Sequence, residues 1–219
     1  MKYTTFVFDF DFTLADATPG IVESINYALN QTGFEPKDRD SIRKTVGMTL
    51  RDVFALFSGS ADTELAEQFV SHFKVMADRV MADNTVLFDD TIAVLRELKA
   101  NGCKTAIVTS KLHYRIDEVL GKYNSTELID YIVGFEDVPN PKPSPEGLHK
   151  AIEHLGASKA TTLYIGDTTI DAKTAANAAV DFAAVLTGTT TAQELLEFPH
   201  VCMANNLAEL FDGLKSKNY

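Results

Sequence analysis

Cysteine is scarce in this sequence, which has only Cys103 and Cys202 among its 219 residues. Because the two show no spacing pattern, we expect small apolar core residues in a reducing compartment rather than a disulfide framework. No uninterrupted apolar run reaches the length that spans a membrane. Asp9 and Asp11 interrupt the N-terminus too early for the apolar segment of a signal peptide. These absences predict a cytoplasmic protein.

Positively charged residues are also few. Lysine and arginine number 20 against 31 acidic residues, which gives a net charge of −11 and a pI near 4.8. Nucleic acids and anionic membranes bind basic surfaces, so this balance excludes both as expected partners. An anionic substrate would have to be held by local cations against the overall field. The content of 45% hydrophobic and 23% charged residues is typical of a globular protein that buries a sizeable core.

An apolar and aromatic run at residues 3–14 predicts a buried strand, and it carries two carboxylates two residues apart. If the strand continues through them, Asp9 and Asp11 point to the same side, because side chains alternate along a strand. Two like charges this close are costly unless a cation lies between them, and Mg²⁺ suits oxygen ligands. Asp9 would then suit a carboxylate nucleophile and Asp11 an acid/base. The same stretch is also compatible with a strand that ends in an acidic turn.

Residues 16–83 show helical periodicity and no strand signal. The pair Thr18-Pro19 predicts a helix start, with Thr18 as the capping side chain and proline in the first turn. Further helices are predicted over residues 38–46, 49–57 and 62–83. We therefore expect this block to be an all-helical insert.

From residue 84 onward, predicted strands alternate with predicted helices. The strands are expected at residues 104–109, 131–133, 162–165, 182–186 and 200–203. This alternation predicts right-handed crossovers and an α/β fold with a mostly parallel, Rossmann-like sheet. The expected domains are a core made of residues 1–15 and 84–219 and an inserted helical cap at residues 16–83.

Polar side chains follow several of these strands, and one lies in a loop before a predicted helix, at the edge where such sheets bind ligands. They are Asp9, Asp11, Thr109, Ser110, Lys142, Asp167 and Asp171. Each one has an ordinary structural explanation. Thr109 could cap the next helix, Lys142 could be an exposed loop lysine, and the aspartates could serve turns and a helix N-terminus. Their convergence at one edge favours a shared chemical role.

The order of these residues resembles that of the haloacid dehalogenase-like hydrolases, a superfamily built mostly of phosphatases. Its pattern is Asp-x-Asp-x-Thr after the first strand, a Thr or Ser after the second, a Lys, and a Gly-Asp followed by another Asp. The resemblance covers essentially the whole chain, and residues 16–83 fall where the family inserts a helical cap. It implies a phosphatase that acts on a small phosphorylated metabolite, either a phosphoglycolate-like monoester or pyrophosphate.

The resemblance also implies a role for each matching residue. Asp9 would attack phosphorus and form an aspartyl-phosphate, while Asp11 would exchange protons with the leaving alcohol and the attacking water. Mg²⁺ would be bound by the carboxylates of Asp9 and Asp167 and by the backbone carbonyl of Asp11. Asp171 would orient a water or Lys142. The implied metal site therefore comprises Asp9, Asp11, Asp167 and Asp171. The transferring phosphate would be bound by Thr109, Ser110 and Lys142.

Two residues of the cap region are candidates for substrate contact. Thr18 lies early in the insert, and Arg51 suits a second anionic group on the substrate, although a solvated arginine on a helix face is the ordinary alternative. Phe12 departs from the family, which usually has glycine there because glycine turns freely. Phe12 implies a β-compatible backbone, a ring directed at the cap, or a buried core aromatic.

Two other functions remain open at this stage. One is a sugar-phosphate mutase or phosphotransferase of the same superfamily, although the histidine of the mutase branch is replaced here by Gly20-Ile21. The other is a non-catalytic phosphoacceptor module with clustered aspartates and a metal. Such modules lack a helical insert after the first strand and the late Gly-Asp-x-x-x-Asp spacing. The expected partners are a small phosphorylated metabolite and, at most, a second copy in a homodimer.

Overall fold

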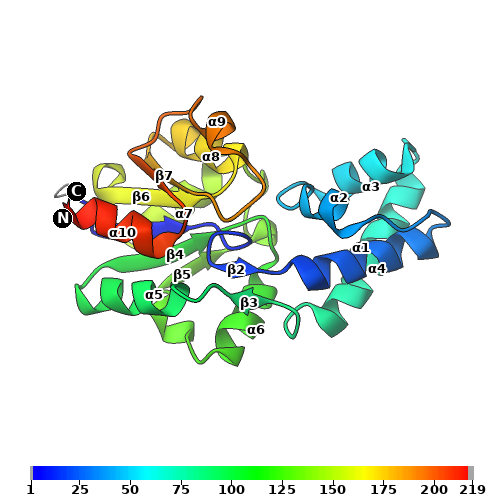
Figure 1. Ribbon diagram of the computed structural model, residues 1–219, viewed down its shortest axis with the longest axis horizontal. Helices are drawn as coiled ribbons and strands as arrows, with labels where there is room; N and C mark the ends of the chain where they lie inside the picture. The colour runs from blue at the N-terminus through cyan, green and yellow to red at the C-terminus, as the bar shows by residue number, and fades with distance from the viewer. Residues whose placement is uncertain (1, 217–219) are drawn as a thin grey trace. The chain divides into compact units, whose positions relative to one another are not determined.

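The computed structural model describes residues 2–216, and the chain divides into two compact units (Figure 1). The core unit comprises Met1–Ala15 and Leu87–Tyr219, and the helical unit comprises Asp16–Val86. The sequence predicts boundaries after residues 15 and 83, whereas the two compact units divide after residues 15 and 86. Where the chain passes between the units, β2 (Ala15–Asp16) and β3 (Val86–Leu87) form a two-stranded sheet.

The core unit contains a six-stranded sheet in which every neighbouring pair is parallel. The strand order is β5-β4-β1-β6-β7-β8, so the first strand lies in the middle. The bounds are β1 Thr5–Phe8, β4 Lys104–Val108, β5 Tyr131–Val133, β6 Thr162–Gly166, β7 Asp181–Val185 and β8 Cys202–Ala204. The predicted parallel α/β fold is confirmed. Because the order reverses at β1, the carboxyl ends of β1, β4 and β6 lie next to one another and define the ligand-binding edge.

Helices cover both faces of this sheet. They are α5 Thr91–Ala100, α6 His113–Lys122, α7 Glu146–His154, α8 Thr169–Ala178, α9 Ala192–Leu195 and α10 Leu207–Ser216. Along β1, Phe6 and Phe8 belong to one apolar cluster and Val7 to the other, as the alternation of side chains requires. The central strand is therefore buried on both faces, which explains its continuous apolar sequence.

The strand β1 ends at Phe8, so the predicted continuation through Asp11 is wrong. After Asp9 donates its backbone N–H to Ile165 (N···O 2.8 Å), the chain turns. The Phe10 carbonyl accepts hydrogen bonds from the amides of Thr13, Leu14 and Ala15, and Phe12 adopts a φ of 61°. The β-compatible backbone considered for Phe12 is thus also wrong. Phe12 is buried and occupies the left-handed conformation that normally favours glycine.

The helical unit contains α1 (Thr18–Gln31), α2 (Arg39–Arg43), α3 (Leu50–Ser58) and α4 (Thr63–Val80). Its core includes Phe54 and Phe69, whose ring centroids are 5.4 Å apart. Thr18 was expected to cap α1 with its side chain, but the N-cap residue is Ala17. Thr18 is instead the first helical residue, and its backbone N–H donates to Asp16 Oδ1 at 2.8 Å. No helix in residues 2–216 is long and apolar enough to cross a membrane.

Candidate active site

Asp9 is the first residue after β1, and it lies at the centre of the ligand-binding edge. Its side chain is 9% exposed, and Oδ1 lies 2.9 Å from Lys142 Nζ. Lys142 comes from the loop before α7, and its Nζ also lies 2.7 Å from Asp171 Oδ1. Two carboxylates from distant parts of the chain are therefore bridged by one ammonium group. Lys142 is 7% exposed, so the alternative of an exposed loop lysine is wrong.

Asp171 has hydrogen-bond donors on both carboxylate oxygens. Oδ1 accepts from Lys142 and from the Tyr164 hydroxyl at 2.9 Å, while Oδ2 accepts from the Thr168 hydroxyl and amide at 2.5 and 3.1 Å. Thr168 is the N-cap of α8, so Asp171 also completes a capping box at that helix start. The structural explanation considered for Asp171 is thus correct, and the residue additionally fixes Lys142.

Asp167, the first residue after β6, has a different environment. Its Oδ2 is buried without a hydrogen-bond partner among the described residues, and Oδ1 accepts a long hydrogen bond of 3.4 Å from the Thr13 hydroxyl. Gly188 approaches so closely that a Cβ at that position would overlap the Asp167 carboxylate. A buried carboxylate that lacks donors needs either a proton or a cation.

Burial and mutual repulsion shift the ionisation of these aspartates. Burial, together with the charges of Asp171 and Asp11, raises the pKa of Asp9 to about 6 despite the opposing charge of Lys142. Burial and the charges of Asp171 and Asp9 hold the pKa of Asp167 well above its usual range. Burial also acts to raise the pKa of Asp171, but Lys142 and the hydroxyls of Thr168 and Tyr164 lower it overall.

This environment fits a hard divalent cation. Asp9, Asp167 and Asp171 each offer an oxygen, and the three oxygens lie within 4.8 Å of one another. Asp171 already has donors on both oxygens, whereas Asp167 has a buried oxygen without one. Asp9 and Asp167 are therefore the better carboxylate ligands for Mg²⁺, which prefers oxygen donors and keeps several waters.

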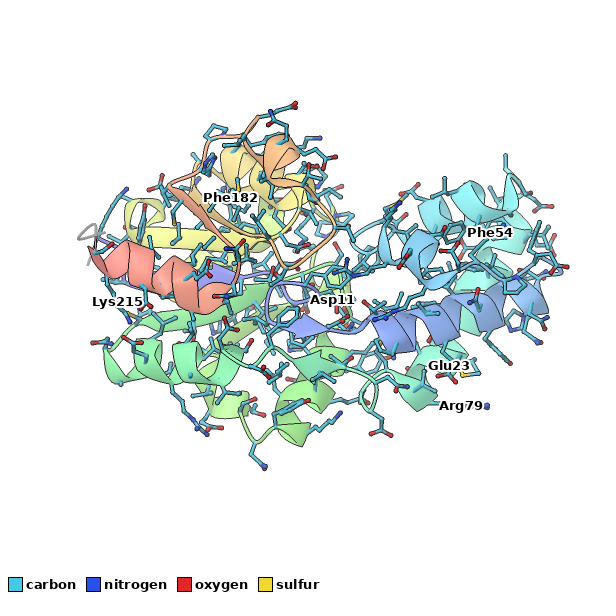
Figure 2. The ribbon with its side chains drawn as sticks, in the orientation of Figure 1. Asp11, Glu23, Phe54, Arg79, Phe182 and Lys215 are labelled. Carbon is cyan, nitrogen blue, oxygen red and sulfur yellow. The ribbon has the colours of Figure 1, made fainter. Side chains whose placement is uncertain are left out.

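Asp11 lies in the loop between β1 and β2, where Figure 2 labels it. Its two carboxylate oxygens accept hydrogen bonds from Lys111 Nζ at 2.9 and 3.1 Å. The side chain of Lys111 is 6% exposed. Asp11 therefore pairs with a second buried lysine, Lys111, and not with Lys142.

Thr109 is the first residue after β4, and its amide donates to Val133 at 3.1 Å. The alternative that Thr109 caps the next helix is wrong, because the N-cap of α6 is Leu112. Thr109 Oγ1 accepts a hydrogen bond from the Lys111 amide at 3.3 Å. Thr109 is buried and Ser110 is half-buried, both beyond the strand next to β1.

Thr18 and Arg51 belong to the helical unit. Thr18 is buried, and its hydroxyl has no hydrogen-bond partner among the described residues. Arg51 is 65% exposed and pairs with Glu67 at 2.6 Å, as expected for an arginine on a helix face. The substrate contacts of Thr18 and Arg51 stay predictions.

Sequence reasoning missed several residues that build the site. Lys111 stands directly after Thr109-Ser110, so its position offered a signal. Tyr164 lies in the apolar strand β6 and gave none, yet its hydroxyl contacts Asp171 and the Val108 carbonyl, the latter at 3.0 Å. Gly188 follows β7, and only its close approach to Asp167 reveals a role.

Mg²⁺ is expected to raise the melting temperature by roughly 5–10 °C at a concentration about 100 times its Kd, and by less at pH 5 than at pH 8. In the metal-free protein, the raised pKa values of Asp9 and Asp167 contribute stability at low pH. For Asp9 this contribution is lost as the pH rises from about 4 through about 6, because the unfolded chain has already released its proton. Mg²⁺ binds the deprotonated carboxylates and offsets that loss. Differential scanning fluorimetry measures the shift.

The matched variant for this measurement is Asp167→Asn, which removes the buried charge. It should melt higher than the wild type without Mg²⁺ and lose most of the increase with it. An equal Mg²⁺ effect at both pH values, or in both proteins, would contradict the metal assignment.

The chain is similar to known proteins over most of its length. Residues 6–185 match a family model described as haloacid dehalogenase-like hydrolase. The chain is 30% identical to a phosphoglycolate phosphatase of Cereibacter sphaeroides over 95% of this chain and 96% of that protein. It is 29% identical to the pyrophosphatase PpaX of Bacillus cereus over 84% of each chain. A crystal structure of a putative haloacid dehalogenase-like hydrolase from Bacteroides fragilis superimposes with a TM-score of 0.92 at 41% identity, covering 95% of this chain and all of that one.

Proposed function

The chain belongs to the haloacid dehalogenase-like hydrolase family and is a phosphatase of that family, and we propose that it hydrolyses a small phosphorylated metabolite with bound Mg²⁺ through an aspartyl-phosphate on Asp9. The observation that carries this proposal is the meeting of Asp9, Lys142 and Asp167 at the carboxyl edge of the sheet. The substrate is proposed to be a phosphoglycolate-like monoester or pyrophosphate, because relatives are named for these activities. The cytoplasmic location expected from the sequence remains part of the proposal.

The first half of the reaction transfers the phosphoryl group to the enzyme. An Asp9 carboxylate oxygen attacks phosphorus, and the bond between phosphorus and the leaving oxygen breaks in line. Asp11 donates a proton to the leaving oxygen. Lys142 lies 2.9 Å from Asp9 and counters the negative charge that gathers there.

The second half releases phosphate. A water attacks the phosphorus of the aspartyl-phosphate, Asp11 accepts the water's proton, and the bond to Asp9 breaks. Thr109 and Ser110 bind the oxygens of the transferring group from the end of β4. When bound, Mg²⁺ screens the repulsion between Asp9 and the anionic substrate. The residues that would hold the ion are Asp9 and Asp167, through their carboxylates, and Asp11, through its backbone carbonyl.

Hydrolysis of para-nitrophenyl phosphate tests the proposed function. We expect release of para-nitrophenol with Mg²⁺ and loss of that activity in EDTA, since the uncompensated aspartates repel the substrate. A panel of phosphorylated metabolites that includes phosphoglycolate and pyrophosphate, read by inorganic phosphate release, then ranks substrates. A protein that cleaves none of them, or that moves a phosphoryl group between sugar positions without releasing phosphate, contradicts the proposal.

A further inference from the structure

We propose that Lys111 binds a second anionic group on the substrate, a carboxylate or a further phosphate, and so selects substrates that carry one. This inference rests on the proposed phosphatase function and assigns the substrate class of that site. When the substrate binds, the ammonium group of Lys111 exchanges its partner, the Asp11 carboxylate, for the second anionic group of the substrate.

The position of Lys111 supports this role. Its backbone is fixed on both sides, because its carbonyl accepts from the Phe135 amide at 2.9 Å and its amide donates to Thr109 Oγ1 at 3.3 Å. Lys111 is two residues from Thr109, which is proposed to bind the transferring phosphate. Its Nζ reaches back to Asp11, the residue proposed to protonate the leaving group. The ammonium thus lies on the leaving-group side of the site.

The two lysines of the site differ in how readily each could exchange its carboxylate partner for an anionic group of the substrate. Lys142 bridges Asp9 and Asp171, which are 9% and 0% exposed, so its loss would leave two buried carboxylates without a partner. Lys111 binds a single carboxylate that is 16% exposed. Replacing that carboxylate by a carboxylate or phosphate of the substrate keeps an ion pair of the same kind, and water can reach the displaced Asp11.

The charge of the whole molecule makes a local cation necessary. With a net charge of −11, the chain repels an anionic substrate unless cations lie beside its binding site. Arg51 was the candidate from the sequence for a second anionic group, but it pairs with Glu67 on the surface of the helical unit. Lys111, by contrast, belongs to the core unit and contacts Asp11, the proposed acid/base.

A matched pair of substrates isolates this contact. Phosphoglycolate and ethyl phosphate both carry a phosphate on a two-carbon group, and ethyl phosphate has a methyl group in place of the carboxylate. We expect the wild-type enzyme with Mg²⁺ to prefer phosphoglycolate in kcat/KM. In Lys111→Met that preference should fall by about 10- to 100-fold, mainly through KM, as expected for loss of a hydrogen bond to a charged group.

The variants separate binding of the second anion from support of Asp11. Loss of the contact to Asp11 alone would lower activity on both substrates equally and leave their ratio unchanged. Lys111→Arg keeps the positive charge and should retain most of the preference. Lys99→Met, which removes a lysine from the exposed pair with Asp130, should leave the ratio unchanged.

The outcomes distinguish the two proposals. If the wild type cleaves neither substrate nor para-nitrophenyl phosphate, the proposed function is overturned. If the wild type cleaves both but shows no preference, or if Lys111→Met keeps the wild-type ratio, the role of Lys111 is overturned. Should the variants fail to fold, inhibition of the wild type by phosphonoacetate and ethylphosphonate decides. We expect phosphonoacetate to bind at least about tenfold tighter, and equal inhibition would overturn the inference.

Discussion

Asp9→Asn is expected to lower kcat by at least about 10³-fold, because an amide oxygen cannot replace the carboxylate as the attacking group. Folding should be preserved, since the change removes one buried charge and Lys142 keeps its pair with Asp171. Steady-state phosphate release with Mg²⁺ measures the effect. Acid-quenched samples of the wild type, but not of the variant, should contain phosphorylated protein.

The matched control for this prediction is Asp212→Asn, an identical change at a side chain that is 80% exposed. Its activity should equal that of the wild type. Activity of Asp9→Asn within tenfold of the wild type would remove Asp9 from the role of nucleophile. Phosphorylated protein in the quenched variant would point to a different acceptor.

Lys142→Met is expected to lower the free energy of unfolding by about 3–5 kcal/mol, the cost of leaving buried charge without its partner. Methionine has a similar length, so the change removes the charge with little loss of packing. Two carboxylates are affected at once, because Lys142 Nζ lies within 3 Å of both Asp9 and Asp171. Urea unfolding at pH 8 without Mg²⁺ measures the difference.

Lys215→Met provides the surface control. Lys215 pairs with Glu97 at 2.7 Å but is 43% exposed, so its loss should cost at most about 1 kcal/mol. Adding Asp171→Asn to Lys142→Met should recover part of the lost stability, since the second change removes one orphaned charge. A cost for Lys142→Met no greater than that for Lys215→Met would show that the buried pair does not support the fold.

The alternation of strands and helices could be predicted because each strand and each helix has its own local pattern of apolar residues. Each strand of the core sheet is a short apolar run, and residues 84–219 repeat that run with a helix between. The predicted parallel sheet followed from this repeat. The approach of Asp9 to Asp167 was also predictable, because neighbouring parallel strands end at one edge whatever their exact lengths.

The end of β1 could not be predicted in the same way. The sequence Phe-Asp-Phe-Asp-Phe continues the alternation of a strand, yet the chain turns after Asp9 because the Phe10 carbonyl collects three amide hydrogen bonds. Phe12 consequently takes a φ of 61° although a side chain disfavours it. The hydrogen bonds of the turn outweigh the preference of Phe12 for a negative φ, and the sequence pattern does not predict those bonds.

The sequence by itself determined the class of fold, the order of the motif residues and the family to which they point, because these depend on spacing along the chain. Only the tertiary structure decided which charged groups meet. It paired Lys142 with Asp9 and Asp171, Lys111 with Asp11, and Arg51 with Glu67. The physical reason is that an ion pair depends on distances of a few ångströms between atoms up to 133 residues apart (142 − 9), and sequence spacing does not encode such distances.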